Sequence, residues 1–197
     1  MVRPREFDEN EVLDAAAHQF WVHGYEATSV RDLAQCMGIT GASLYNAFGD
    51  KRSLFQRALT HYIERSFGDR VSRFEQNLRP LDAVKAFFRE IVERSICDTD
   101  RKGCLLVNSA LEVAPHDADF QTMIAKVLVA VEAFFRRCVH AGQQAGEIST
   151  AQSADDLARL LLSVHLGIRV LARTRPERAL LEGVIRPALA LLEPSAS

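Results

Sequence analysis

Apolar residues return every three or four positions along most of the chain, as they do on the buried face of an α-helix. No stretch alternates apolar and polar residues in the manner of a β-strand. The pattern therefore predicts an all-α fold. We expect helices over about residues 8–23, 29–37, 41–48, 50–67, 81–97, 104–113, 117–144, 153–171 and 176–191, with a short amphipathic stretch between Gly68 and Pro80.

The second and third expected helices are short, and a tight turn joins them. Ser29 and Asp32 have the spacing of a capping box, which opens a helix. Gly38 ends that helix, because glycine readily takes the left-handed backbone of a tight turn. Thr40 then caps the next helix. Such a pair is typical of a helix-turn-helix, whose second helix enters the major groove of DNA. An ordinary helical hairpin with a polar face would show the same spacing.

The helix over residues 41–48 has a composition that suits contact with DNA. Small residues at positions 40–43 allow its first turn to approach base edges closely. Leu44 and Phe48, four residues apart, can anchor the back of the helix. Tyr45 and Asn46 offer polar groups with a longer reach. We therefore favour a DNA-reading helix over a surface hairpin.

This region resembles the DNA-binding domain of the tetracycline-repressor-like (TetR) family of bacterial regulators. The similarity extends over roughly residues 7–60, and its motifs fall in residues 28–34, 38–40, 43–48, 51 and 54–55. It implies an all-helical homodimer with an N-terminal three-helix helix-turn-helix domain and a larger C-terminal domain for ligand binding and dimerisation. We place these domains at residues 1–50 and 51–197, with the helix from Asp50 to about Phe67 connecting them.

The resemblance also implies which residues contact operator DNA. Two departures from the family pattern reduce the expected base contacts: Gly41 and Ala42 stand where many members have a charged or larger residue, and Asn46 stands where histidine is common. Lys51 lies in the first turn of the following helix, where a lysine beside exposed N–H groups suits a phosphate oxygen. The predicted DNA-binding set is Thr28, Ser29, Thr40, Gly41, Ala42, Ser43, Tyr45, Asn46 and Lys51.

Charge does not favour DNA binding by itself. The formal net charge is −2, and residues 1–57 hold six Lys or Arg against eight Asp or Glu. A DNA-binding surface must therefore come from the placement of charges, with the acids on the far face. The basic residues expected near DNA are Arg3, Arg5, Arg31, Lys51 and Arg52.

The resemblance implies a ligand-responsive transcriptional regulator, most often a repressor that a small-molecule inducer releases from a palindromic operator. An activator would have the same sequence features. A helical ligand carrier or enzyme with a vestigial helix-turn-helix is favoured only by the acidic N-terminal balance. The chain has no Gly-x-Ser-x-Gly, Gly-rich phosphate loop, H-x-x-x-H or Cys/His cluster. We expect no enzymatic activity, no cofactor and no metal site.

A ligand pocket in the C-terminal helices would be mostly apolar with a few polar groups. Each candidate residue also has a simpler explanation as a core or surface side chain. The predicted ligand-binding set is Phe87, Cys104, Asn108, Glu112, Phe134, His165 and Arg169.

Cys104 supports a second mechanism. It follows Arg101, Lys102 and Gly103 and opens an apolar helix, and a thiol at a helix N-terminus near cations tends to be reactive. The run from Lys102 to Val107 also resembles a TetR subgroup in which some members sense electrophiles or oxidants through this cysteine. A thiol-based repressor is therefore an alternative to simple ligand binding.

The last two helices carry apolar seams at alternating spacings of three and four residues. In a homodimer such seams form a four-helix bundle, which sets two recognition helices about 34–36 Å apart or a multiple of this distance. Packing within one subunit would give the same pattern. The predicted interface is Leu157, Leu161, Val164, Ile168, Leu171, Leu181, Val184, Ala188 and Leu191.

The remaining features concern the cellular location. No apolar run approaches the roughly 18 residues of a membrane span, and the N-terminus lacks the apolar core of a signal peptide. The four cysteines, Cys36, Cys97, Cys104 and Cys138, are scattered without C-x-x-C spacing. We expect a cytoplasmic protein with reduced thiols and no membrane partner.

Overall fold

The computed structural model describes residues 8–194, and within this range every regular element is a helix, as the sequence predicts. The helices of the N-terminal region are α1 (Glu9–His23), α2 (Val30–Cys36), α3 (Gly41–Phe48) and α4 (Lys51–Ile63). A π-helical segment (Glu64–Gly68) leads into α5 (Asp69–Asn77), α6 (Pro80–Ile96) and α7 (Leu105–Glu112). A 3₁₀ turn (Ala114–His116) precedes α8 (Ala118–Gln144), α9 (Ala154–Thr174) and α10 (Arg178–Ala190).

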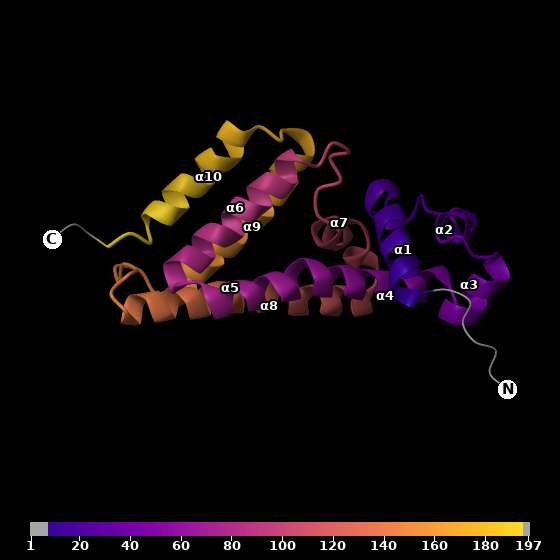
Figure 1. The fold of residues 1–197 in the computed structure, drawn as a ribbon, viewed down its shortest axis with the longest axis horizontal. Coiled ribbons are helices and arrows are strands. Elements are labelled where there is room, and N and C mark those ends of the chain that lie inside the picture. Colours follow the sequence, from indigo (N-terminus) through magenta and orange to yellow (C-terminus); the bar gives the residue numbers. More distant parts are fainter. Residues whose placement is uncertain (1–7, 195–197) are drawn as a thin grey trace.

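The molecule is elongated, with α1, α2 and α3 at one end and α10 toward the other (Figure 1). Helix α8 has 27 residues and is therefore about 40 Å long at the usual rise per residue. It runs along the side of the molecule that α4 and α5 also follow (Figure 1). Helices α6 and α9 pack against α8, and α10 packs against both α6 and α9. The end that holds α1, α2 and α3 is thus joined to the C-terminal helices along a continuous helical side.

Two apolar cores hold this arrangement. The N-terminal core combines the buried faces of α1–α4 with α7 and the first turns of α8, where Phe55 packs against Phe20 and Phe120. The C-terminal core is formed by α5, α6, α9, α10 and the second half of α8, around Phe87 and Phe135. The boundary at residues 50 and 51 stays a prediction. Helices α4 and α7 therefore pack with α1, α2 and α3 in the N-terminal core.

The connecting helix differs from the sequence prediction. We expected a helix to about Phe67, a further amphipathic turn or two after Gly68 and a break at residues 78–80, but the helical path continues through Gly68 into α5 and ends at Asn77. Gly68 keeps a right-handed helical backbone with φ −57° and ψ −53°, so it does not interrupt the path. Leu78 is extended, and Arg79 is held extended by Pro80, which disfavours a helical residue before it. The predicted break at residues 78–80 is therefore confirmed, whereas the helix that we ended near Phe67 runs on to Asn77.

Candidate DNA-binding surface and ligand cavity

Local hydrogen bonds build the helix-turn-helix as the sequence predicts. The Asp32 amide donates to Ser29 Oγ at 3.2 Å, and the Ser29 amide donates to Asp32 Oδ2 at 3.0 Å. This reciprocal pair is the capping box of α2. Gly38 has φ 65°, the left-handed conformation that the turn requires. The Ser43 amide donates to Thr40 Oγ1 at 3.1 Å and opens α3.

Helix α3 has one buried and one open face. Leu44 and Phe48 are buried in the N-terminal core, which confirms their role as anchors. Tyr45 retains 53% of its side-chain exposure, and Asn46 is also exposed. Thr40 and Ala42 are exposed at the start of the helix, whereas Gly41 and Ser43 are half-buried. The open face therefore offers a phenol, an amide and small side chains to a groove.

Lys51 is held beside α3 by an aromatic ring. Its ammonium Nζ lies 4.3 Å from the centre of the Tyr25 ring, a cation–π contact that fixes the stem of the side chain. Asp50 caps α4 by accepting from the Ser53 amide at 2.7 Å. Ser29, at the start of α2, is also exposed. The position of Lys51 in the first turn of α4 suits a phosphate contact.

Two expected DNA contacts do not fit the structure. Thr28 is only 1% exposed, and its hydroxyl donates to the Gly24 carbonyl at 2.6 Å, so it supports the loop after α1. Arg52 turns toward α8 instead of DNA, with bonds of 2.7 and 2.9 Å to Asp117 and 2.7 Å to Asp119. Sequence spacing cannot reveal these partners, because they are distant in the chain or lie in a loop. Arg3 and Arg5 lie outside the described residues, and Arg31 is exposed.

Acidic residues of α1 are neutralised by α4 and the π-helical segment. Glu9 pairs with Arg57. Asp14 lies 2.9 Å from His61 Nε2 and 2.5 Å from Arg65 Nη1. These pairs hold two of the N-terminal acids against the connecting helix. Their negative charges are thereby partly balanced, so they would repel a phosphate backbone less.

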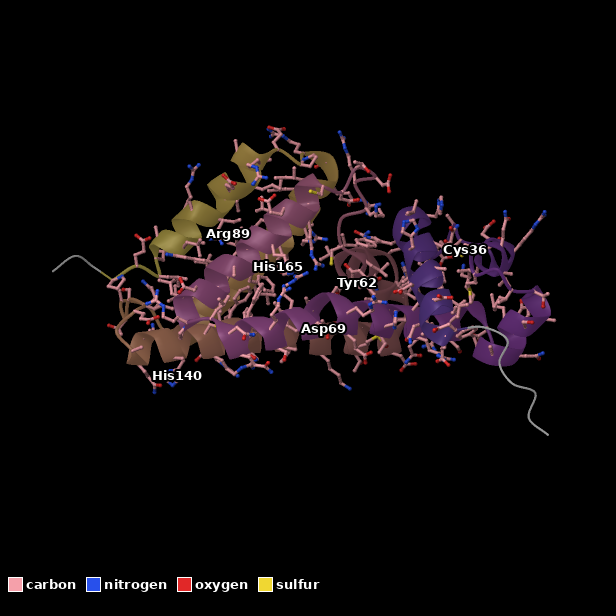
Figure 2. The ribbon with its side chains drawn as sticks, in the orientation of Figure 1. Cys36, Tyr62, Asp69, Arg89, His140 and His165 are labelled. Carbon is pink, nitrogen blue, oxygen red and sulfur yellow. The ribbon has the colours of Figure 1, made fainter. Side chains whose placement is uncertain are left out.

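A cavity of about 590 Å³ lies between α1 and the connecting helix on one side and the C-terminal helices on the other. Helix α1 contributes Trp21, the connecting helix contributes Tyr62, and the C-terminal helices contribute most of the remaining wall. Tyr62 and His165 both line this cavity and lie in the central part of the molecule (Figure 2). The apolar part of the wall includes Phe67, Phe87, Ile91, Leu106, Val127 and Val131. A mostly apolar cavity with a few polar groups is the usual form of a small-molecule site.

Four residues of the predicted ligand set line this cavity: Phe87, Cys104, His165 and Arg169. The other three lie elsewhere and have structural partners. Asn108 Nδ2 donates to the Lys102 carbonyl at 2.9 Å, and Glu112 Oε1 accepts from the Glu26 amide at 3.0 Å. Phe134 is fully buried behind Phe87, with their ring centres 5.4 Å apart. They are therefore excluded from the cavity wall, because helical spacing alone does not show which side of a helix meets the cavity.

Tyr62 and Arg70 are cavity residues that the sequence pattern did not reveal. Tyr62 reads as an apolar helix position, and Arg70 lies in a strongly polar stretch that resembles a solvated face. In the structure, the Tyr62 hydroxyl donates to Cys104 Sγ at 3.7 Å, and Arg70 is only 9% exposed. Burial, and then the neighbouring Cys104, raises the pKa of Tyr62 well above its usual value. The phenol is therefore neutral and serves as a hydrogen-bond donor.

His165 has an unusual environment on α9. Its Nδ1 atom is buried and has no hydrogen-bond partner within residues 8–194. Burial, with smaller contributions from the positive charges of Arg169 and Arg70, lowers the pKa of His165 to about 3. The imidazole is therefore neutral at physiological pH, and His165 lines the cavity with its Nδ1 atom unpartnered among residues 8–194.

The predicted dimer seam is largely internal. Five of its residues, namely Leu157, Leu161, Ile168, Leu181 and Ala188, are buried in the C-terminal core of their own protomer. Val164, Leu171 and Val184 are half-buried, and Leu191 is 48% exposed. The five buried residues are not available to a partner subunit, because α9 packs against α6 and α8 and α10 packs against α6 and α9.

A second apolar stripe follows the outer side of α9 and α10. Its members are half-buried or exposed and recur every three or four residues, and Val170 is 50% exposed. On α9 they are Leu160, Val164, Gly167, Val170 and Leu171, and on α10 they are Leu180, Gly183, Val184, Pro187 and Leu191. We call these residues the outer stripe. It is an apolar surface that a single protomer covers only in part, because Leu160, Val164, Leu171 and Val184 also pack against the C-terminal core.

Other classes of site are not apparent between residues 8 and 194. In that range, histidine, cysteine and acidic side chains nowhere gather in threes close enough to hold a metal ion. The same range has no helix with the length and apolar character required to span a bilayer.

Comparisons with known proteins agree with this geometry. Residues 12–58 match the family model "Bacterial regulatory proteins, tetR family", and residues 80–187 match "Tetracyclin repressor-like, C-terminal domain". The uncharacterized HTH-type transcriptional regulator YezE of Bacillus subtilis (strain 168) is 32% identical, over 98% of this chain and 100% of that protein. The HTH-type transcriptional repressor ComR of Escherichia coli (strain K12) is 28% identical, over 87% and 82% respectively.

A solved structure gives the same result at the level of the fold. A cysteine mutant of the TetR family transcriptional regulator CifR, in complex with a 26-base-pair double-strand operator DNA, superposes with a TM-score of 0.84. The two sequences are 32% identical, and the match covers 95% of this chain and 98% of that one. The helix-turn-helix, the helical C-terminal half and these relatives together identify the chain as a member of the TetR family of DNA-binding transcriptional regulators.

Proposed function

We propose that this regulator is a homodimeric repressor that binds a palindromic operator through α3 and leaves it when a small molecule fills the cavity. One observation carries the proposal. The cavity wall includes Trp21 of α1 and Tyr62 of the connecting helix as well as residues of the C-terminal helices. A ligand there touches the DNA-binding end directly. The repressor role is supported by relatives such as ComR, which is a repressor.

The mechanism follows from the packing of α1 and α4. These two helices share the N-terminal core with α3, so they move the reading helix when they move. A ligand shifts the protein toward whichever arrangement binds it more tightly. If that arrangement changes the spacing of the two α3 helices, the operator and the ligand exclude each other by reciprocal coupling.

Operator contact would use the open face of α3. Tyr45 and Asn46 would reach base edges or backbone in the major groove, and Lys51 would contact a phosphate. Ser29, Thr40, Gly41, Ala42 and Ser43 line the approach to this face and remain proposed contacts. The outer stripe of α9 and α10 would pair with its copy, which gives two reading heads related by a two-fold axis. A palindromic operator matches that symmetry.

Variants of the open face test DNA binding. An operator is first selected from random duplexes with the wild-type protein, and affinity is then measured by fluorescence anisotropy across a salt series. We expect Tyr45→Ala to weaken binding by about tenfold or more. Lys51→Ala should weaken it and lower the salt slope by about 2 for the two copies in a dimer.

Lys126→Ala is the matched control, because Lys126 is an exposed lysine on α8, outside the DNA-binding end. Circular dichroism verifies that all variants keep the fold. If Tyr45→Ala and Lys51→Ala bound the operator as tightly as Lys126→Ala, the proposed surface would be wrong. Absence of any DNA binding by the wild type at low salt would instead favour the ligand carrier.

A second candidate function is a thiol-responsive repressor. Cys97 and Cys104 both line the cavity, and Cys104 Sγ accepts the hydroxyl of Tyr62. An electrophile that enters the cavity therefore comes close to two thiols. With a maleimide, the sulfur would bond to one alkene carbon, and a proton from solvent would complete the other.

Alkylation with N-ethylmaleimide distinguishes the two cysteines. If Cys104 is the sensor, treatment releases operator DNA from the wild type and from Cys97→Ser, while Cys104→Ser stays bound. Mass spectrometry identifies the modified residue in each case. Release that persists in Cys104→Ser would exclude Cys104 as the sensor and point to another thiol, whereas no release from the wild type would leave reversible ligand binding as the only proposal.

A further inference from the structure

Positive charge dominates one part of the cavity wall. The wall includes Arg65, Arg70, Arg94 and Arg169 but only two acidic residues, Asp14 and Asp98. Both acids already have cationic partners, because Asp14 pairs with Arg65 and Asp98 pairs with Lys102. The charges of the remaining three arginines must therefore be balanced by groups outside the wall or remain unbalanced.

Glu90 supplies only part of that balance. Its carboxylate accepts from Arg70 at 3.0 Å, from Arg73 at 2.5 Å and from Arg94 at 2.8 Å, so three guanidinium groups share one negative charge. Arg73 and Arg94 are more than half exposed, so water screens them, whereas Arg70 is only 9% exposed. Burial, and then the charge of Arg94, lower the pKa of Arg70. Arg70 is therefore a buried cation with incomplete compensation.

Arg169 adds a second cation at the same wall. Its guanidinium donates to Ser95 Oγ at 3.0 Å and to the carbonyl of Gly103. Both acceptors are neutral, so these bonds orient the group without cancelling its charge. Arg169 follows His165 by four residues on α9, which puts the two side chains on one face of the helix.

His165 and Phe87 connect the two cations. The Phe87 ring centre lies 5.5 Å from Arg70 Cζ and 5.3 Å from the centre of the His165 ring. His165 Nδ1 is buried with no partner among the described residues. In the tautomer that carries hydrogen on Nδ1, this atom is a donor without an acceptor. Arg70 and His165 thus both lie against Phe87, and Arg169 lines the same cavity.

The rest of the wall is mostly apolar and determines the uncharged part of the ligand. Ile91, Val127 and Val131 are apolar, and Leu106 and Trp21 extend this surface toward the DNA-binding end. A cavity of about 590 Å³ holds a small organic molecule but leaves no room for a macromolecule. The ligand therefore needs an apolar body as well as a charged group.

We propose that the inducer is a small apolar carboxylate, whose anionic group binds Arg70 and Arg169 beside His165 and whose hydrocarbon body lies against Phe87, Ile91 and Val131. This inference rests on the proposed function and adds the chemical class of its ligand. A carboxylate accepts charge-assisted hydrogen bonds from both arginines. It also accepts from Nδ1–H of His165 in the tautomer that carries hydrogen there. A neutral ligand would leave the arginine charges unbalanced, and an amine would add to the repulsion.

Matched ligands that differ only in charge test the class. The probes are octanoate, octanamide and octylamine as an aliphatic series, and phenylacetate, phenylacetamide and phenethylamine as an aromatic series. Calorimetric titration of the full-length wild type at neutral pH measures their affinities. We expect at least one acid to bind about tenfold or more tightly than its amide, and the amines to bind weakest. The series that binds more tightly shows whether the body is aliphatic or aromatic.

Three variants locate the charge preference. Arg169→Gln and Arg70→Gln should remove most of the difference between acid and amide, while Arg169→Lys keeps part of it. Arg73→Gln is the matched control, because Arg73 shares Glu90 with Arg70 but does not line the cavity. It should retain the full preference. The wild-type comparison remains decisive even if an arginine variant fails to fold.

The outcomes separate the ligand class from the function. Amides that bind as tightly as acids, tighter binding of the amines, or failure of both acids to bind would each overturn the carboxylate proposal. Operator release is measured separately, with the complex formed before the probe is added. An acid that binds with the expected preference but does not release DNA would support the ligand class and contradict induction. If amides released DNA as readily as acids, the result would support induction and contradict the carboxylate class.

Discussion

Burial changes the acid–base chemistry of His165. A histidine in water titrates near pH 6.5, whereas burial, reinforced by Arg169 and Arg70, lowers the pKa of His165 to about 3 in the folded protein. The unfolded chain therefore binds a proton below about pH 6.5 that the folded chain does not bind. Stability from the neutral ring is fully present above that pH and is lost progressively as the pH falls toward 3.

The pH dependence of unfolding checks this assignment. Between about pH 7.5 and about pH 5.5, the ligand-free wild type should lose about 1.4 kcal/mol more of its free energy of unfolding than His165→Gln. Urea unfolding at equal protein concentration measures both, and the comparison removes the contributions of the other titrating groups. Parallel curves for the two proteins would mean that His165 is not held neutral.

The connecting helix is the element that joins the cavity to the DNA-binding end. Helix α4, the π-helical segment and α5 form one path, and the π-helical segment supplies Arg65, Ser66 and Phe67 to the cavity wall. A π-helical turn inside an α-helix is common at functional sites. Gly68 closes this segment in an ordinary helical conformation, so glycine is not required there by its backbone.

The same substitution at two glycines should have opposite effects. At Gly68 an added Cβ meets no atom within 4 Å, so Gly68→Ala should raise the free energy of unfolding by about 0.5–1 kcal/mol. At Gly142 on α8 the added Cβ would lie 2.5 Å from Ile148 Cδ1, and Ile148 is itself buried. Gly142→Ala should therefore lower the free energy by about 1–3 kcal/mol. Chemical denaturation measures both, and a loss of stability in Gly68→Ala would show that the helical path there is strained.

At the scale of the whole molecule, α9 and α10 have two apolar sides. The inner side fills the C-terminal core, and the outer stripe is only partly covered in a single protomer. Pairing of the outer stripe with its copy would bury it and fix the distance between two reading heads. The homodimer is therefore a requirement of the proposed operator binding.

Two exposed valines provide a matched test of the dimer. Val170 is 50% exposed within the outer stripe, and Val129 is 65% exposed on α8. Val170→Glu should place a charge in the interface and yield folded monomers that no longer bind operator, because each copy would bury an unpaired carboxylate. Val129→Glu should remain dimeric. Sedimentation velocity measures the mass, and a dimeric Val170→Glu protein would contradict the proposed interface.

Local sequence determined the helices and the helix-turn-helix, because their signals act over three or four residues. Ser29, Gly38 and Thr40 form the predicted caps and turn, and Leu44 and Phe48 anchor α3 as their spacing requires. The family resemblance came from the same short stretch. These features needed no knowledge of how the helices pack.

Only the tertiary structure decided which side of each helix meets the cavity, the core or the outer surface. Helical spacing shows that an apolar side exists, but α9 has two such sides. Five predicted interface residues on α9 and α10 are buried in their own protomer. Asn108 and His165 are both polar residues in apolar helices, yet only His165 faces the cavity. Arg52 and Arg70 look alike in sequence, but distant acids engage Arg52 and packing buries Arg70. Such outcomes depend on contacts between residues far apart in the chain, which no local pattern encodes.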